Sequence, residues 1–192
     1  MSAQRLAAAS GHSLRALRKH RPSALCLSSG AVIRDQSPMP PKVLAGCLRD
    51  GLKPDDWYDL INSKVFFWLD PERLNRQRRV CGAAPQRVIV VDACRMLDKH
   101  GCRAAVTPIN TGNAMRAAAS RGLSTFVPWP RWTLEAWASE NPGHSPARAP
   151  AHRPVELTIQ DEVEDIFEYA RTIIALGPGQ ILSRDGRIAL EA

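Results

Sequence analysis

The sequence predicts an α+β protein with a small split or mixed sheet and short helices. Short apolar runs that are typical of strands alternate with short amphipathic stretches that are typical of helices. They lack the regular strand–helix–strand order of a doubly wound sheet. The 192 residues are 44% hydrophobic and 23% charged, which is ordinary for one globular domain. We therefore expect a basic, flexible segment over residues 1–22 and a single α+β domain over residues 23–192, with a Pro-rich loop at 141–154.

The first half of the chain predicts short elements separated by prolines. Strand-like residues 25–36 end at the sequence SPMPP, and residues 65–69 form an apolar strand that we expect to be central and covered on both faces. Asp70 is a natural N-cap for the helix that follows it. Helical patterns cover residues 13–20, 41–52, 53–63 and 71–80.

The second half continues the alternation. Strands are predicted near residues 86–93, 103–107, 124–132 and 154–161, and short helices over residues 94–101 and 133–140. Within the strand near 154–161, Val155, Leu157 and Ile159 point to one face and Glu156 points to the other. Residues 162–176 have acidic residues first and a basic residue later, which predicts a closing helix. The last dozen residues predict turns or a terminal hairpin.

The net charge of +7 is concentrated at the start of the chain. There are 26 Lys and Arg against 19 Asp and Glu. Five of these bases and none of the acids lie in the first 21 residues, so the other 21 bases leave only +2. The high pI is therefore weak support for nucleic-acid binding by the folded body. The acid-free start also resembles an organellar transit peptide. A chain that is rich in Ala, Arg and Pro has a similar composition there without any targeting function.

Neither a membrane segment nor a metal site is predicted. No window approaches about 18 uncharged apolar residues and no signal peptide is recognisable, so we expect a cytoplasmic protein. The five cysteines include no C-x-x-C pair, and no His lies at ligand spacing beside two of them. Reduced thiols in a cytosolic core explain the cysteines.

A carboxylate and a guanidinium stand out by their placement. Glu156 lies within a strand among apolar neighbours, where a carboxylate is costly unless it faces a cleft or a partner. An exposed sheet face would explain it equally well. Arg34 ends a strand-like run, where its planar fork could grip a phosphate or carboxylate. A surface ion network with Asp35 is the simpler explanation.

Aromatic and amide side chains suggest further contacts. Phe67 and Trp68 lie in an apolar strand of which one side packs the core while the other could offer a wall to a planar ligand. Asn110 and Thr111 lie in a polar loop after a strand, where they could line a cleft or only shape turns.

Five segments together resemble a bacterial domain family of unknown function: GAVIRDQSPMPPKVL, LKPDDWYDLINSKVFFWLDPERLNRQ, VIVVDACRML, VTPINTG and TFVP. That family is similar to the DarT-type ADP-ribosyltransferases, which consume NAD and modify single-stranded DNA. The more remote likeness rests on VFFWLDP and on VELTIQDEVEDI, in which Glu156 matches the carboxylate of the DarT-like pattern. The resemblance implies an ADP-ribosyltransferase-like fold and NAD-dependent transfer to nucleic acid or protein, including toxin-type activity.

The resemblance also implies roles for individual residues. Glu156 would be catalytic, because its carboxylate would orient a ribose hydroxyl and favour the positive charge that develops as the nicotinamide–ribose bond breaks. Arg34 would grip a phosphate or the acceptor. The wall made by Phe67 or Trp68 would flank the nicotinamide, and Asn110 and Thr111 would line the same cleft.

One part of the family pattern has no counterpart. DarT-type enzymes begin with a strand that carries a His, whereas His12 and His20 lie in a basic context that does not predict a strand. We expect this His-bearing strand to be missing, which leaves a second hypothesis open. In it the protein is a catalytically degenerate module that binds a nucleotide or nucleic acid through Arg34 and the aromatic side chains. Both hypotheses require Arg34 and Glu156 to line one concave pocket.

Overall fold

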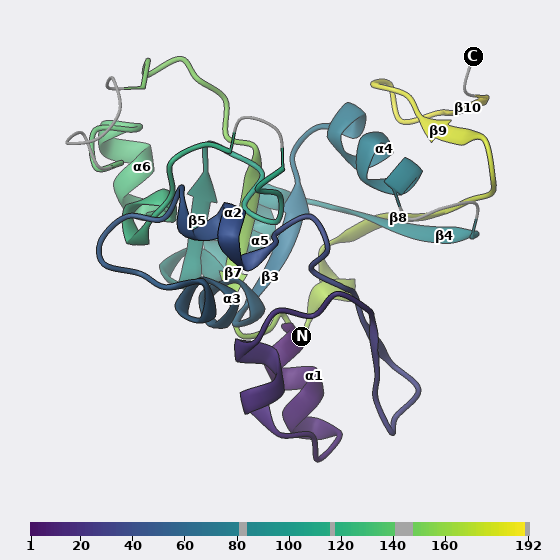
Figure 1. Cartoon of the computed structure of the whole chain (residues 1–192). Helices are drawn as coiled ribbons and strands as arrows, with labels where there is room; N and C mark the ends of the chain where they lie inside the picture. Colours follow the sequence, from purple (N-terminus) through teal and green to yellow (C-terminus); the bar gives the residue numbers. More distant parts are fainter. Residues whose placement is uncertain (81–83, 116–117, 141–147, 191–192) are drawn as a thin grey trace.

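The computed structural model describes residues 1–80, 84–115, 118–140 and 148–190 (Figure 1). The α+β class is confirmed, and the named strands pair in four separate antiparallel sheets. The strands are β1 (Leu25–Cys26), β2 (Val32–Ile33), β3 (Lys64–Trp68), β4 (Gln86–Val91), β5 (Ala104–Thr107), β6 (Val127–Pro128), β7 (Glu156–Gln160), β8 (Ala170–Leu176), β9 (Gln180–Leu182) and β10 (Ile188–Leu190). The α-helices are α1 (Ala3–Ala9), α2 (Pro41–Ala45), α3 (Pro54–Asn62), α4 (Pro71–Val80), α5 (Ala93–His100) and α6 (Trp129–Glu135). The 3-10 helices are η1 (Leu14–Arg18), η2 (Gly101–Arg103), η3 (Leu123–Thr125) and η4 (Ile166–Glu168).

The largest sheet has the strand order β3-β7-β5-β6. The strand predicted to be central is therefore an edge strand, and β7 lies between β3 and β5 instead. The apolar sequence of β3 was misleading because only one of its faces packs in the core. Its other face carries Phe66, whose side chain is 38% exposed.

The two faces of this sheet follow the period-two alternation of its strands. Leu157 and Ile159 lie on one face and pack with Met96 and Val106 in a hydrophobic cluster, as the sequence predicts. Glu156 lies on the other face, in register with Trp68 and Thr107.

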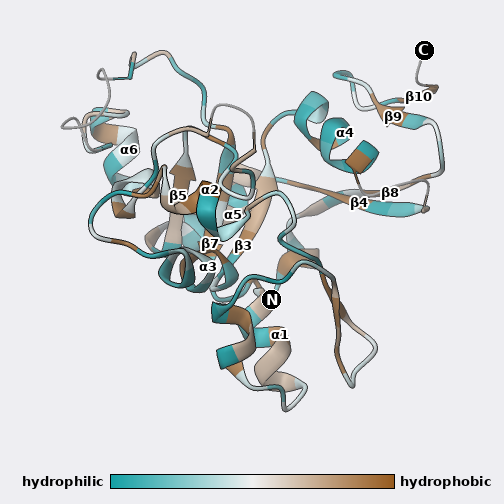
Figure 2. Ribbon diagram, in the orientation of Figure 1, coloured by the Kyte–Doolittle hydropathy of each residue, from teal (hydrophilic) through white to brown (hydrophobic). Residues whose placement is uncertain are grey.

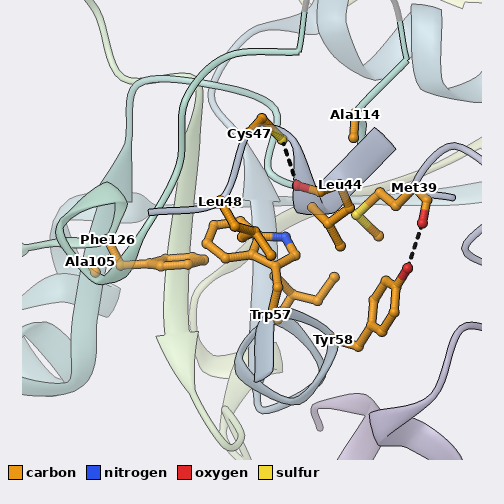
Figure 3. Close-up of a cluster of buried hydrophobic side chains, with 10 residues drawn as sticks. Met39, Leu44, Cys47, Leu48, Trp57, Tyr58, Ala105, Ala114 and Phe126 are labelled. Atoms are coloured by element: carbon orange, nitrogen blue, oxygen red, sulfur yellow. Dashed lines mark hydrogen bonds between the residues drawn. The ribbon is translucent and has the colours of Figure 1, made fainter. Parts of the chain in front are cut away.

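A second hydrophobic cluster includes residues from α2, α3 and the segment before β6 (Figure 3). Trp57 is fully buried at its centre, with its ring centroid 5.7 Å from that of Phe126. Tyr58 is also fully buried, and its hydroxyl donates a hydrogen bond to the Met39 carbonyl at 2.6 Å. That bond ties the proline-rich segment after β2 to α3.

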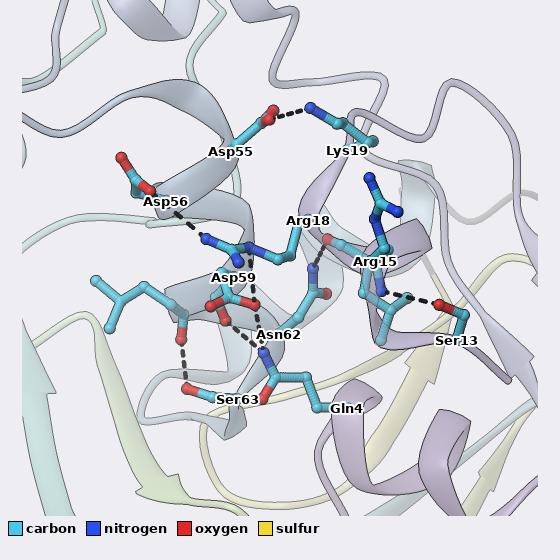
Figure 4. A network of polar contacts seen from close by, with 12 residues as sticks. Gln4, Ser13, Arg15, Arg18, Lys19, Asp55, Asp56, Asp59, Asn62 and Ser63 are labelled. Atoms are coloured by element: carbon cyan, nitrogen blue, oxygen red, sulfur yellow. Dashed lines mark hydrogen bonds and ion pairs between the residues drawn. The ribbon is translucent and has the colours of Figure 1, made fainter. Parts of the chain in front are cut away.

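The N-terminal segment is folded against the domain, in contrast to the loose segment that the sequence predicts. Leu17 is fully buried in a cluster of α1, η1 and the β1–β2 hairpin. The Ser2 amide donates to the Asp161 carbonyl at 2.7 Å. Two of the basic residues face the acidic side of α3, where Lys19 pairs with Asp55 and Arg18 lies 3.9 Å from Asp56 (Figure 4). The partners are far apart in sequence, so local composition suggested an unpaired tail.

The closing helix predicted for residues 162–176 is also wrong. Only η4 is helical there, and β8 pairs with β4 in a two-stranded antiparallel ribbon. The β-branched run of Thr172, Ile173 and Ile174 favours a strand over a helix. Ile89 and Ile173 are paired in register and stay 41% and 48% exposed, so this ribbon is only partly buried. Figure 2 shows the hydrophobic colour of this ribbon, which extends toward α4 and β9 (Figure 1).

The helices that border β3 begin as predicted. Pro54 opens α3, and the Asp56 carboxylate accepts a hydrogen bond from the Lys53 amide at 2.9 Å. Asp70 accepts a hydrogen bond from the Glu72 amide at 2.8 Å, at the start of α4. Of the predicted Pro-rich loop, residues 141–147 lie outside the described residues, and residues 148–154 contain no helix or strand. Within the described ranges, no helix combines the length and the apolar character needed to cross a bilayer.

Candidate functional site

A cavity of about 360 Å³ lies on the Glu156 face of the main sheet. Its volume falls within the range of about 300–1,000 Å³ that is usual for small-molecule pockets. Several separate parts of the chain form its wall, among them Arg21 before β1, the end of β2 with the segment after it, the end of α3, β3 with α4, the loop after β5, and the first residue of β7. All six residues predicted for the site border this cavity: Arg34, Phe67, Trp68, Asn110, Thr111 and Glu156.

Glu156 is buried, with 4% of its surface exposed. Its Oε2 lies 2.9 Å from the hydroxyl oxygens of both Thr107 and Thr111, and it accepts a hydrogen bond from the Thr111 amide at 3.2 Å. Oε1 has one hydrogen bond from a described residue, at 3.3 Å from the same amide nitrogen. Oε1 is therefore the oxygen with more capacity to meet a ligand.

The Thr107 hydroxyl carries one proton and has two neighbours that could accept it. It lies 2.8 Å from the Ile109 carbonyl oxygen and 2.9 Å from Glu156 Oε2. A carbonyl can only accept, so when Thr107 donates to Ile109 its contact with Glu156 requires a proton on the carboxyl group. The geometry therefore accommodates a neutral Glu156.

Burial raises the pKa of Glu156 from 4.5 to about 7. The hydrogen bonds from Thr111 and Thr107 oppose this rise, as does the positive charge of Arg121, but desolvation is the largest effect. A carboxyl group with a pKa near neutral pH can both give and take a proton at that pH. This is the property required of a general acid or base.

The loop after β5 is fixed by donors behind it. The Thr111 carbonyl accepts hydrogen bonds from Trp57 Nε1 at 3.3 Å and from Arg121 Nη1 at 3.1 Å. Arg121 is 2% exposed, and its Nη2 also donates to the Asn113 carbonyl at 2.9 Å. Asn110 shapes the turn through its Oδ1, which accepts a hydrogen bond from the Gly112 amide at 3.0 Å. Asn110 and Thr111 thus do both things that the sequence left open: they shape the loop and they border the cavity.

Of the two aromatic residues predicted to form a wall, only Trp68 lies on the Glu156 face of the sheet. Phe67 pairs in register with Leu157, which lies on the opposite face from Glu156, and packs against the cluster around Met96. All three aromatic residues of β3 also border a second cavity of about 460 Å³ between β3, β4 and α4. Trp68 shares the Glu156 row, and Phe66 is one step along the same face. The sequence predicted Phe67 because both faces of β3 are apolar, so nothing in β3 itself shows which face meets the cavity. The register of β3 against β7 places Phe66 and Trp68 on the Glu156 face.

Arg34 is exposed at the edge of the cavity. Its guanidinium forms no ion pair within 4.0 Å and no hydrogen bond with any described residue, so the expected network with Asp35 is not formed by direct contact. Asp35 instead accepts hydrogen bonds from the side chain and amide of Ser37, which lower the pKa of the Asp35 carboxyl. The Arg34 charge lowers it further.

Several polar residues of the cavity wall were not predicted as site residues, among them Arg21, Gln36 and Lys64. Arg21 was assigned to the loose segment, although it is 9% exposed and borders the cavity. Gln36 is 4% exposed and follows Arg34 in the same segment. Lys64 donates to Gln160 Oε1 at 2.9 Å, and burial lowers the pKa of its ammonium group. Of these, Gln36 could have been selected from the sequence, because it is the last residue of the strand-like run before SPMPP and lies close to Arg34.

The polar groups of the cavity suit an organic ligand. Within the described ranges, no group of three or more His, Cys, Asp or Glu side chains is placed so that it could hold a metal ion. Phe66 and Trp68 offer flat surfaces to a ring, Glu156 can bind a hydroxyl or a developing positive charge, and Arg34 can bind an anion.

Comparisons with known proteins give a family but no characterised relative. No curated protein and no solved structure matches the chain significantly. One family model matches residues 1–170, a span that includes the N-terminal segment and every residue bordering the cavity described above. Because this match covers most of the 192 residues, the chain belongs to the family described as a family of unknown function (DUF7002).

Proposed function

We propose that this protein is an NAD-dependent ADP-ribosyltransferase-like enzyme that modifies nucleic acid or protein. Glu156 is its catalytic carboxylate. The supporting observation is that Glu156, with a pKa of about 7, borders one cavity with Arg34, Trp68 and the Asn110–Thr111 loop. The two segments that resemble the DarT-type enzymes contribute Trp68 and Glu156, and the segments that resemble the family of unknown function contribute Arg34, Asn110 and Thr111. A cavity of about 360 Å³ suits the nicotinamide and its ribose, with the rest of NAD extending beyond it.

The chemistry follows from the charges. The bond between the nicotinamide nitrogen and the ribose C1′ breaks, and the electron pair leaves with nicotinamide, which becomes neutral. The ribose then carries positive charge, which an ionised Glu156 stabilises across a low-dielectric site. A nucleophile of the acceptor forms the new bond to C1′, and its proton passes to the carboxylate. The aromatic surface of Trp68 or Phe66 flanks the nicotinamide ring.

A second candidate function is a catalytically degenerate module that binds a nucleotide or nucleic acid without chemistry. One observation favours it: three hydrogen-bonding groups of Thr107 and Thr111 surround Glu156 Oε2, so this acid also joins β7 to the loop after β5. A purely structural Glu156 would leave binding to Arg34 and the aromatic side chains.

The two functions are separated by NAD labelled in the nicotinamide ring, incubated with and without single-stranded oligonucleotide or a protein acceptor. We expect the wild-type protein to release nicotinamide, with a rate that rises with pH through about 7 as Glu156 ionises. Glu156→Gln should reduce release by at least about a hundredfold, since it removes an electrostatic contribution of roughly 3 kcal/mol. Glu135→Gln, which removes an exposed carboxylate on α6, is the matched control.

The outcomes discriminate clearly. Equal release by the wild type and by Glu156→Gln would rule out Glu156 as the catalyst. Binding of NAD by both proteins without any release would favour the binding module. Failure of the wild-type protein to bind NAD or a nucleic acid would overturn both functions.

A further inference from the structure

Two buried hydrogen-bond donors on residues of the cavity wall have no partner among the described residues. They are Nε of Arg21 and Nε2 of Gln36. Arg21 is 9% exposed and Gln36 is 4% exposed, and both residues border the cavity. A buried donor without a partner is costly, and two of them side by side in a cavity wall point to an acceptor that comes with a ligand.

The two residues are held together by their backbones. The Gln36 amide donates to the Arg21 carbonyl at 2.6 Å, and the Arg21 amide donates to Gln36 Oε1 at 3.4 Å. An N–H group can only donate, so this second contact fixes which end of the Gln36 side chain is oxygen. The NH₂ end of the Gln36 side chain is the one left without a protein acceptor.

The guanidinium of Arg21 is a buried charge that lacks a carboxylate partner. Its other nitrogens donate only to neutral acceptors, at 3.3 to 3.4 Å: the carbonyls of Leu17 and Arg34 and the side chain of Asn62. No described carboxylate lies within 4.0 Å of it. Burial lowers the pKa of Arg21, and the charge of Asp35 opposes this only in part. Arg34 adds a second guanidinium at the rim of the same cavity.

We infer that Arg21 and Gln36 form an anion subsite of the cavity, and that this subsite holds a phosphate group of the ligand with Arg34 at its rim. A phosphate offers several strong acceptor oxygens, which suit the Arg21 Nε–H, the Gln36 amide and the Arg34 fork together. The inference deepens the proposed function and rests on it for the choice of a pyrophosphate-bearing nucleotide as ligand. The anion subsite lies in a different wall of the cavity from Glu156, since it belongs to the segment that includes β2.

Gln36→Glu is the variant that tests this subsite. The new carboxylate keeps the acceptor for the Arg21 amide, occupies Arg21 through an ion pair and repels an anion. Isothermal titration calorimetry should show that affinity for ADP-ribose and for inorganic pyrophosphate falls by about tenfold to a hundredfold, as expected for the loss of a charged hydrogen bond. Affinity for adenosine, which has no phosphate, should stay unchanged. Gln180→Glu adds the same charge outside the cavity and should bind all three probes as the wild type does.

A second variant guards against a folding defect. Gln36→Met removes the unpaired donor without adding charge, and it should weaken pyrophosphate binding by a few-fold to about tenfold. If Gln36→Glu and Gln36→Met bind pyrophosphate and ADP-ribose as tightly as the wild type, or if the wild type binds neither, the anion subsite is refuted. If the wild type binds both probes in a Gln36-dependent way but releases no nicotinamide from NAD, the anion subsite stands and the transferase function fails.

Discussion

The protonation of Glu156 makes the stability of the fold depend on pH, and Glu156→Gln isolates this effect. The pKa of Glu156 is about 7 in the folded protein, against 4.5 for an unperturbed carboxyl group. Between these values the folded state holds a proton that the unfolded state has released. Stability due to this group is therefore fully present below pH 4.5, and it is lost as the pH rises through about 7. A glutamine at the same position does not titrate.

The size of the effect follows from the two pKa values. The difference between 4.5 and about 7, at about 1.4 kcal/mol for each pH unit, gives a total loss of about 3 kcal/mol. About 2.5 kcal/mol of this loss falls between pH 5 and pH 8, because the unfolded carboxyl is already largely ionised at pH 5. That amount is a large fraction of the stability of an ordinary domain.

The measurement is urea unfolding of the wild type and Glu156→Gln at four pH values from 5 to 8. We expect the free energy of unfolding of the wild type, taken relative to the variant, to fall from pH 5 to about pH 7 and then to level off, because Glu156 is ionised in both states above its folded pKa. Glu135→Gln removes an exposed carboxylate whose pairing with Arg131 is confined to the surface of α6, so its difference from the wild type should stay flat. A flat difference for Glu156→Gln as well would mean that Glu156 is ionised throughout, and the reasoning from its burial would be refuted.

Two further substitutions test the packing of the N-terminal segment and the anchoring of the loop after β5. Leu17→Ala should lower the free energy of unfolding by about 3 kcal/mol because Leu17 is fully buried, whereas Leu14→Ala, at a 43% exposed position, should change it by less than about 0.5 kcal/mol. Equal and negligible effects would show that the N-terminal segment lies outside the cooperative unit. Arg121→Met should destabilise the fold by about 3 kcal/mol, since the carbonyls of Asn113 and Ala119 lose the donor that Arg121 provides and the Thr111 carbonyl keeps only Trp57 Nε1. Arg131→Met on the surface of α6 is its control, and the same small effect for both would mean that Arg121 does not hold the loop.

The sequence was sufficient where a local pattern decides the structure. The alternation around Glu156 predicts both the strand and the face on which this acid lies, because period two is a property of any strand. Asp70 followed by proline predicts the start of α4 for a similar reason, since capping involves only neighbouring residues. The position of Arg34 at a strand end placed it at the cavity edge.

The sequence was insufficient where partners are distant. The choice between Phe66 and Phe67 depends on the register of β3 against β7, and nothing within β3 reveals it. Arg21 looked like part of a loose basic tail because Asn62, which accepts its hydrogen bond, lies 41 positions further along the chain. Residues 170–176 have a pattern that allows either a helix or a strand, and they form a strand because they pair with β4.

The pairing of Glu156 with Trp68 and Thr107 limits the kinds of mutation that this protein can accept during evolution. A shift of β7 by one residue would turn Glu156 toward the hydrophobic cluster around Met96 and turn Leu157 toward the cavity. Inserting or deleting one residue within the paired strand would therefore damage scaffold and cavity at once. Mutations that exchange side chains in place are the ones through which the cavity can acquire a new ligand while the scaffold survives.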